Sequence, residues 1–107
     1  MAIVELRQYR MRPGQRDKWV NYMEEVIIPF QTAKGMSILG SWVGEEEEDL
    51  FVWIRRFDSE RERERLYKEV YDSEEWKEKI APSIPEMMDR EKAKVTRMTP
   101  TPRSAAP

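Results

Sequence analysis

The sequence contains no cysteine and no histidine among its 107 residues. These absences exclude disulfides, thiolate nucleophiles and zinc sites built from either side chain. They also exclude Ser-His-Asp and Cys-His catalysis, and haem ligated by histidine. We therefore expect neither a metal nor a cofactor. Any acid–base chemistry must use carboxylates, lysine, tyrosine, arginine or bound water.

The sequence also lacks a long apolar run and a dominant sign of charge. No segment approaches the roughly 18 apolar residues of a membrane span. Residues 1–14 carry charges instead of the apolar run of a signal peptide. The net charge is −2 with acids and bases interspersed, whereas nucleic-acid binders show a clustered basic surface. We expect a cytoplasmic protein that binds neither membranes nor nucleic acid.

The composition suits one small domain. The chain is 39% hydrophobic and 37% charged, which is enough for a single modest core. A domain of this size buries a limited fraction of its surface, so pairing with a second copy would stabilise it. We assign residues 1–98 to the domain and the proline-rich residues 99–107 to a C-terminal tail.

The pattern of apolar residues predicts the element order β-α-β-β-α-β. Alternation predicts strands over residues 3–11, 36–43, 50–57 and 93–98. Helical spacing predicts a first helix over about 15–34, with Trp19 in its core, Pro29 kinking it and Gly35 ending it. Ser59 and Glu62 form a capping box for a second helix, and Ser73 caps a short third one. This order is typical of an α+β, ferredoxin-like fold, with helices on one face of a four-stranded antiparallel sheet.

The strand over residues 50–57 has two apolar sides. We assign Val52 and Ile54 to the side covered by helices. The other side then holds Arg55 and the aromatic residues Phe51, Trp53 and Phe57. That is too much aromatic surface to remain exposed. We therefore predict that two sheets pair face to face in a homodimer, as a dimeric α+β barrel.

The first strand sends Glu5, Arg7 and Tyr9 to one side, which we place in the barrel interior. With Arg55 they are the candidate catalytic residues. Two arginines against one glutamate leave positive charge that an acidic ligand would neutralise, and Tyr9 could donate to a developing oxyanion. The candidate substrate-binding residues are Arg7, Tyr9, Trp42, Trp53 and Arg55. The alternative is a polar network that only fixes the sheet or the dimer.

Several segments resemble the NIPSNAP family. ELRQYRMRPG (5–14) resembles the family's opening E-L-R-x-Y-x-x-x-P-G, and GMSILGSW and FVWIRRFDS resemble its second and third strands. Tyr71 and Trp76 also fit, and the likeness covers about residues 3–100. It implies the dimeric α+β barrel and a homodimer, but no settled reaction. The motif residues carried over are Glu5, Leu6, Arg7, Tyr9, Pro13 and Gly14.

Three functions remain open at this point. The first is a homodimer that binds a small acidic or aromatic metabolite in its interior, with or without metal-free catalysis. The second is a non-enzymatic assembly or adaptor protein that uses the ERERER segment (60–65) and the tail as contacts. The third is a cofactor-free monooxygenase of the same fold. We interpret the ERERER segment and the acidic loop 45–49 as solvated surfaces.

Overall fold

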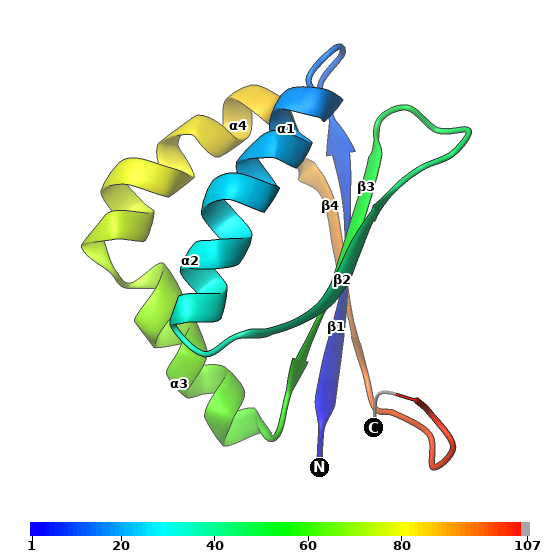
Figure 1. The fold of residues 1–107 in the computed structure, drawn as a ribbon, viewed down its shortest axis with the longest axis vertical. Helices are drawn as coiled ribbons and strands as arrows, with labels where there is room; N and C mark the ends of the chain where they lie inside the picture. The colour runs from blue at the N-terminus through cyan, green and yellow to red at the C-terminus, as the bar shows by residue number, and fades with distance from the viewer. Residues whose placement is uncertain (106–107) are drawn as a thin grey trace.

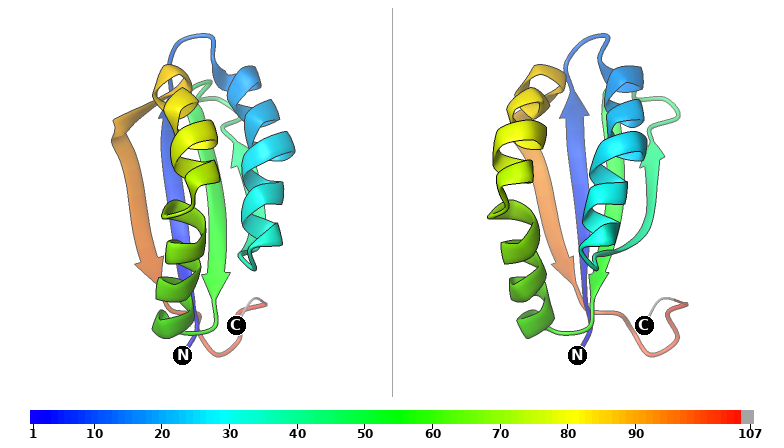
Figure 2. Two further views of the ribbon diagram at one scale, coloured as in Figure 1. Left: turned by 90° about the vertical axis from the view of Figure 1, so that its left-hand side faces the viewer. Right: turned by 60° about the vertical axis from the view of Figure 1, so that its left-hand side comes forward.

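The computed structural model describes residues 1–105 and confirms the α+β, ferredoxin-like architecture (Figure 1). Its strands are β1 (Ile3–Met11), β2 (Ser37–Val43), β3 (Leu50–Phe57) and β4 (Met88–Met98). They form one antiparallel sheet in the order β2-β3-β1-β4. All the helices cover one face of this sheet (Figure 2). None of the helices within residues 1–105 is both long and apolar enough to cross a membrane.

The first helical segment passes through Pro29 without breaking. It consists of α1 (Arg16–Tyr22), the π-helical η1 (Met23–Ile27) and α2 (Ile28–Ala33). The Ile28 N–H bonds to the carbonyl of Met23, five residues earlier, and Pro29 follows at the start of α2. The wider π turn makes room for the proline ring, which would otherwise clash with the preceding turn.

Gly35 ends this segment as expected. Its φ is +109°. Its N–H bonds to the carbonyl of Thr32, and the Met36 N–H bonds to that of Gln31, both at 3.0 Å. This is the Schellman pattern, which satisfies the last carbonyls of a helix and favours glycine.

The second helical half begins at the predicted cap. The Ser59 hydroxyl accepts from the Glu62 N–H at 3.1 Å, and the Glu62 carboxylate accepts from the Asp58 N–H at 3.0 Å. The helix α3 (Glu60–Tyr71) follows, and the Ser73 hydroxyl then accepts from the Trp76 N–H at 3.2 Å. The remaining helical pieces are η2 (Glu75–Ile80), η3 (Ala81–Ser83) and α4 (Ile84–Met87).

The assignment of the two sheet faces was wrong. The helices cover Phe51, Trp53, Arg55 and Phe57, all buried, while Val52 and Ile54 face outward and are only half-buried. The same inversion applies on β1, where Glu5 and Tyr9 are buried beneath the helices. Alternation separates two faces but does not say which one the helices cover, and here the larger aromatic side chains fill the space below them. The polar cluster therefore lies within a single chain and not between two sheets.

The centre of the sheet's outer face is apolar. Trp42 pairs with Val52, and Ile54 pairs with Leu6, so these side chains share that face. The C-terminal tail leaves the domain on this side (Figure 1). The predicted tail extends to residue 107, and its last two positions, 106 and 107, lie outside the described residues. Pairing of two copies stays a prediction.

Candidate functional site

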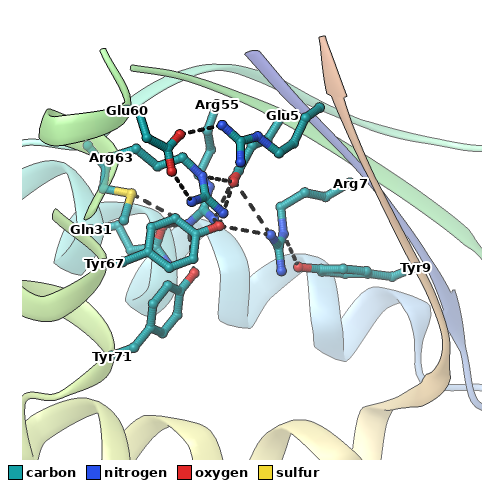
Figure 3. A network of polar contacts seen from close by, with 11 residues as sticks. Glu5, Arg7, Tyr9, Gln31, Arg55, Glu60, Arg63, Tyr67 and Tyr71 are labelled. Atoms are coloured by element: carbon teal, nitrogen blue, oxygen red, sulfur yellow. Dashed lines mark hydrogen bonds and ion pairs between the residues drawn. The ribbon is translucent and has the colours of Figure 1, made fainter. Parts of the chain in front are cut away.

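Glu5 lies at the centre of the polar cluster beneath the helices (Figure 3). Its side chain is 0% exposed. One carboxylate oxygen accepts from Arg55 at 2.8 Å, and the other accepts from Arg63 at 2.8 Å and from the Tyr67 hydroxyl at 2.6 Å. A nitrogen of Arg7 lies 3.6 Å from the first oxygen. One carboxylate is therefore shared among three arginines.

Arg55 is held on every side by the protein. One terminal nitrogen donates to Gln31 at 2.8 Å and to the Tyr71 hydroxyl at 2.7 Å, and the other donates to Glu5 and to Tyr67. Only its Nε lacks a partner among residues 1–105, and that atom is enclosed. Arg55 is 0% exposed. The residue expected to bind substrate is thus a fixed internal cation.

The arginines keep Glu5 ionised. Burial alone would raise the pKa of Glu5, but the charge of Arg55 and the hydrogen bonds from Tyr67 and Arg63 lower that pKa to about 2. Burial raises the pKa of Tyr67, so this phenol stays protonated and donates to Glu5. A carboxylate with so low a pKa is a weak base at neutral pH. Of the two roles open to Glu5, orienting an arginine or acting as a base, the low pKa favours the first.

The positive charge of the cluster is not fully neutralised. At the outer rim, Arg63 also binds Glu60 at 3.3 Å. Further inside, Arg7 and Arg55 face the single carboxylate of Glu5. Arg7 donates from Nε to the Tyr9 hydroxyl at 2.8 Å, while its Nη2 has no partner within residues 1–105. Its side chain is 18% exposed, so the excess charge lies at Arg7.

A cavity of about 260 Å³ opens beside Arg7, between the sheet and the helical layer. Its polar and aromatic lining comes from β1, α1, β3, α3, η2 and β4, in the residues Arg7, Tyr9, Trp19, Trp53, Tyr71, Trp76 and Arg90. Much of the remaining lining is apolar. An aromatic slot with Arg7 in its wall and Arg90 at its rim suits a flat, acidic molecule.

A bulge in β4 borders this cavity. Gln8 pairs with Lys94 and Arg10 pairs with Asp89, so Tyr9 alone lies opposite residues 90–93. Both Arg90 and Ala93 from this bulge line the cavity. The bulge also explains why β4 begins at Met88 and not at the predicted residue 93: it interrupts the alternation by which a strand is recognised.

The structure brings together most, but not all, of the predicted site residues. Arg7, Tyr9 and Trp53 line the cavity, with Glu5 and Arg55 behind them. Trp42 does not join them, because its partner Val52 faces outward and paired residues share a sheet face. Trp42 is 52% exposed on that outer face.

The sequence interpretation missed the contribution of α3. Arg63, Tyr67 and Tyr71 follow one another at intervals of four, which places them on one side of the helix, and that side meets the polar cluster. We had assigned Arg63 to a solvated surface because the ERERER segment contains no apolar residue. The four-residue spacing toward two tyrosines was the available signal. Trp19 was expected only in the core of its helix, yet it lines the cavity, as Trp76 does.

The acidic loop and the hollow beside it are a weaker candidate site than the cavity beside Arg7. Glu47 and Asp49 bind Arg10 at 3.1 and 3.0 Å, and Arg16 donates to the carbonyl of Gly44. No cluster of acidic side chains within residues 1–105 is arranged to hold a metal ion. The hollow between this loop and Arg12 is wide and open at the surface. We place the candidate site in the cavity beside Arg7.

Comparisons with known proteins agree with the fold. A model of the NIPSNAP family matches residues 4–104. A NIPSNAP family protein from Agrobacterium tumefaciens is similar at 20% identity, with 98% of each chain covered and a TM-score of 0.85. An uncharacterized NIPSNAP-like domain protein from Burkholderia xenovorans is 20% identical, with 96% of this chain and 88% of that chain covered and a TM-score of 0.85.

A second Agrobacterium tumefaciens NIPSNAP family protein, of unknown function, is 21% identical. The similarity covers 97% of this chain and 92% of that chain, with a TM-score of 0.86. At such identities the likeness concerns the fold. A search of the curated proteins finds no match.

Proposed function

The chain belongs to the NIPSNAP family, and on that premise we propose that it binds a small, flat, acidic metabolite in the cavity beside Arg7. The observation that carries the proposal is the partly unbalanced charge of Arg7. The carboxylate of Glu5 lies closer to two other arginines, so it balances the charge of Arg7 only in part. A guanidinium cannot lose its proton, so it favours an anion beside it. A carboxylate or phenolate bound in the cavity would supply that anion.

The size of the cavity limits the ligand. Its volume of about 260 Å³ lies at the low end of the roughly 300–1,000 Å³ that ligand sites usually span. The walls include the rings of Trp19, Trp53 and Trp76, which suit stacking against a flat molecule. One or two rings fit this space. A polycyclic substrate, as the monooxygenase alternative requires, would be too large.

The chemistry at the cavity favours binding and stabilisation of an anion. Glu5 lies behind Arg7 with a pKa of about 2, and burial raises the pKa of Tyr67. Glu5 is therefore a weak base at neutral pH, and Tyr67 already holds its proton, so neither group serves as a general base. Arg7 and Tyr9 are instead donors suited to an oxyanion. The adaptor alternative predicts an interior filled by aromatic side chains, and the cavity argues against it.

The variant Arg7→Met tests this function. Arg55 and Arg63 each lie 2.8 Å from Glu5, so the carboxylate keeps two partners when Arg7 is removed. We expect the affinity for 2-naphthoate or benzoate, measured by titration calorimetry, to fall at least about tenfold, as for loss of a charged hydrogen bond. Urea unfolding should show that the domain stays folded.

The matched control is Arg10→Met. Arg10 lies on the same strand, but binds the exposed Glu47 and Asp49. This variant should bind both probes like the unmodified protein. Equal affinities for the Arg7→Met variant, or no binding of either probe to the unmodified protein at millimolar concentration, would contradict the proposed function.

A further inference from the structure

Two buried indole N–H groups in the cavity lining have no acceptor. Trp19 is 1% exposed and Trp53 is 2% exposed. The Nε1 atom of each lacks a hydrogen-bond partner among residues 1–105. A buried indole N–H normally donates to something, because an unpaired donor is costly to bury. Both residues line the cavity, so a ligand oxygen that reached either indole would supply the missing acceptor.

Two tyrosines in the lining present donors of the same kind. The Tyr9 hydroxyl accepts from Arg7 at 2.8 Å, and the Tyr71 hydroxyl accepts from Arg55 at 2.7 Å (Figure 3). Arginine offers no acceptor in return, so each hydroxyl keeps its proton for another group. Neither hydroxyl donates to a residue within 1–105. The arginines thus leave both phenols as donors.

The lining contains no side chain that could balance these donors. Its polar and aromatic members are arginine, tyrosine and tryptophan, with no aspartate, glutamate, asparagine, glutamine, serine or threonine. The nearby carboxylate of Glu5 is fully enclosed and already accepts from three groups. A ligand therefore meets donors and positive charge, and the only side-chain oxygens in the lining are the tyrosine hydroxyls, which already accept from arginine.

We propose that the ligand is an aromatic anion whose polar atoms all accept hydrogen bonds, such as a deprotonated carboxylate or phenolate without an amine or amide. This rests on the proposed function and names the ligand class of the same site. An N–H group on the ligand would find only the tyrosine oxygens, which already accept from arginine, and this poor pairing opposes its binding. The cavity thus selects against amides and amines as well as for anions.

The rim of the cavity also favours an anionic ligand. Arg90 lies on the β4 bulge, lines the cavity and is exposed. Positive charge at the mouth of a site raises the local concentration of anions and speeds their association. Both the approach to the cavity and binding within it therefore favour a negatively charged ligand.

Matched ligands on one ring system test this inference. Benzoate, benzamide and benzylamine, together with 2-naphthoate and 2-naphthamide, should be titrated against the intact protein by calorimetry. We expect each acid to bind at least about tenfold more tightly than its amide, and the amine to bind most weakly. An amide that binds as tightly as its acid would overturn the inference and leave the proposed function standing. No binding by any compound would overturn the proposed function itself.

The variant Trp53→Phe separates the indole donor from the ring. It removes the N–H and keeps an aromatic wall, so we expect 2-naphthoate to bind about three- to tenfold more weakly, the loss of one hydrogen bond. The control Trp42→Phe changes an indole on the outer face of the sheet and should bind normally. Normal binding by both Trp53→Phe and Trp19→Phe would overturn the assignment of the indoles as ligand donors.

Discussion

At the scale of single residues, the enclosed carboxylate of Glu5 makes the rest of the cluster possible. Burying an ion is costly unless close partners compensate for the lost water. Glu5 has such partners in Arg55, Arg63 and Tyr67, all within 2.8 Å. Glu5 in turn is the counter-ion of Arg55, which no other carboxylate within residues 1–105 contacts. Loss of Glu5 would leave Arg55 as a buried charge without a counter-ion.

The variant Glu5→Gln should lower the free energy of unfolding at neutral pH by about 3–5 kcal/mol, as for a broken buried ion pair. The difference from the unmodified protein should depend on pH. The pKa of Glu5 falls from 4.5 to about 2 on folding. Its stabilising effect is therefore complete above pH 4.5 and is lost as the pH falls through 2, a pH-dependent part of roughly 3 kcal/mol. Urea unfolding of both proteins at several pH values measures this.

The control for this comparison is Glu47→Gln. Glu47 binds Arg10 at 3.1 Å on the surface, and such exposed pairs contribute little. Its effect should stay below about 1 kcal/mol at every pH. A Glu5→Gln variant as stable as this control would mean that the cluster does not need the carboxylate.

The sequence predicted which residues of β1 belong together in the site better than it predicted what surrounds them. Alternation placed Glu5, Arg7 and Tyr9 on one side of β1, and the structure confirms that they belong together. Alternation could not indicate that this side lies under helices, because the other side is also apolar. It could not place Trp42 either, since a bulge between Ile38 and Gly40 shifts the register of β2.

At the scale of elements, the end of the first helical segment depends on Gly35. Its φ of +109° is a conformation that other residues rarely adopt. A Cβ atom at this position would also lie 3.2 Å from Cδ2 of Leu66 on α3. The turn into β2 thus requires glycine for its backbone and for its closeness to the next helix.

The variant Gly35→Ala should lower the free energy of unfolding by about 1–2 kcal/mol, from backbone strain and the close contact together. Gly14 provides the comparison, with a φ of +73° and no atom within 4 Å of a Cβ. Because asparagine tolerates that left-handed conformation, Gly14→Asn should cost less than about 1 kcal/mol. Thermal or urea unfolding gives both values, and equal losses would argue against the contact with Leu66.

Regular elements were predictable, and irregular ones were not. The bounds of β1 and β3 match the prediction, and Ser59 begins α3 as its capping box indicates. The π turn before Pro29 and the bulge at residues 90–93 were not foreseen, because each departs from the period by which its element is recognised. The bulge borders the cavity, so the site is less predictable than the fold.

At the scale of the whole molecule, the outer face of the sheet is suited to a second copy of the chain. Leu6, Val52 and Ile54 form its apolar centre, with the exposed Trp42 beside them. Apolar patches of this kind usually mark an interface. We propose a homodimer with this face at its centre. The earlier prediction had placed Phe51, Trp53 and Phe57 there.

The variant Trp42→Glu tests the dimer. A charge within the sheet interface would be buried without a partner, so we expect the sedimentation velocity to change from that of a dimer to that of a monomer. The control is Val95→Glu. Val95 is 44% exposed, but pairs with Arg7 and so lies on the helix side of the edge strand. A monomeric unmodified protein, or equal effects of both variants, would contradict the proposed interface.

The bulge in β4 has a consequence for how this domain could diversify. Residues 90–93 lie outside the paired register of β1 and β4, so their number is not fixed by the pairing on either side. An insertion in a regular strand would turn every later side chain to the other face. At the bulge, an added residue changes only the rim. Related chains could therefore acquire cavities of different widths by altering the length of this segment, while the buried cluster around Glu5 stays unchanged.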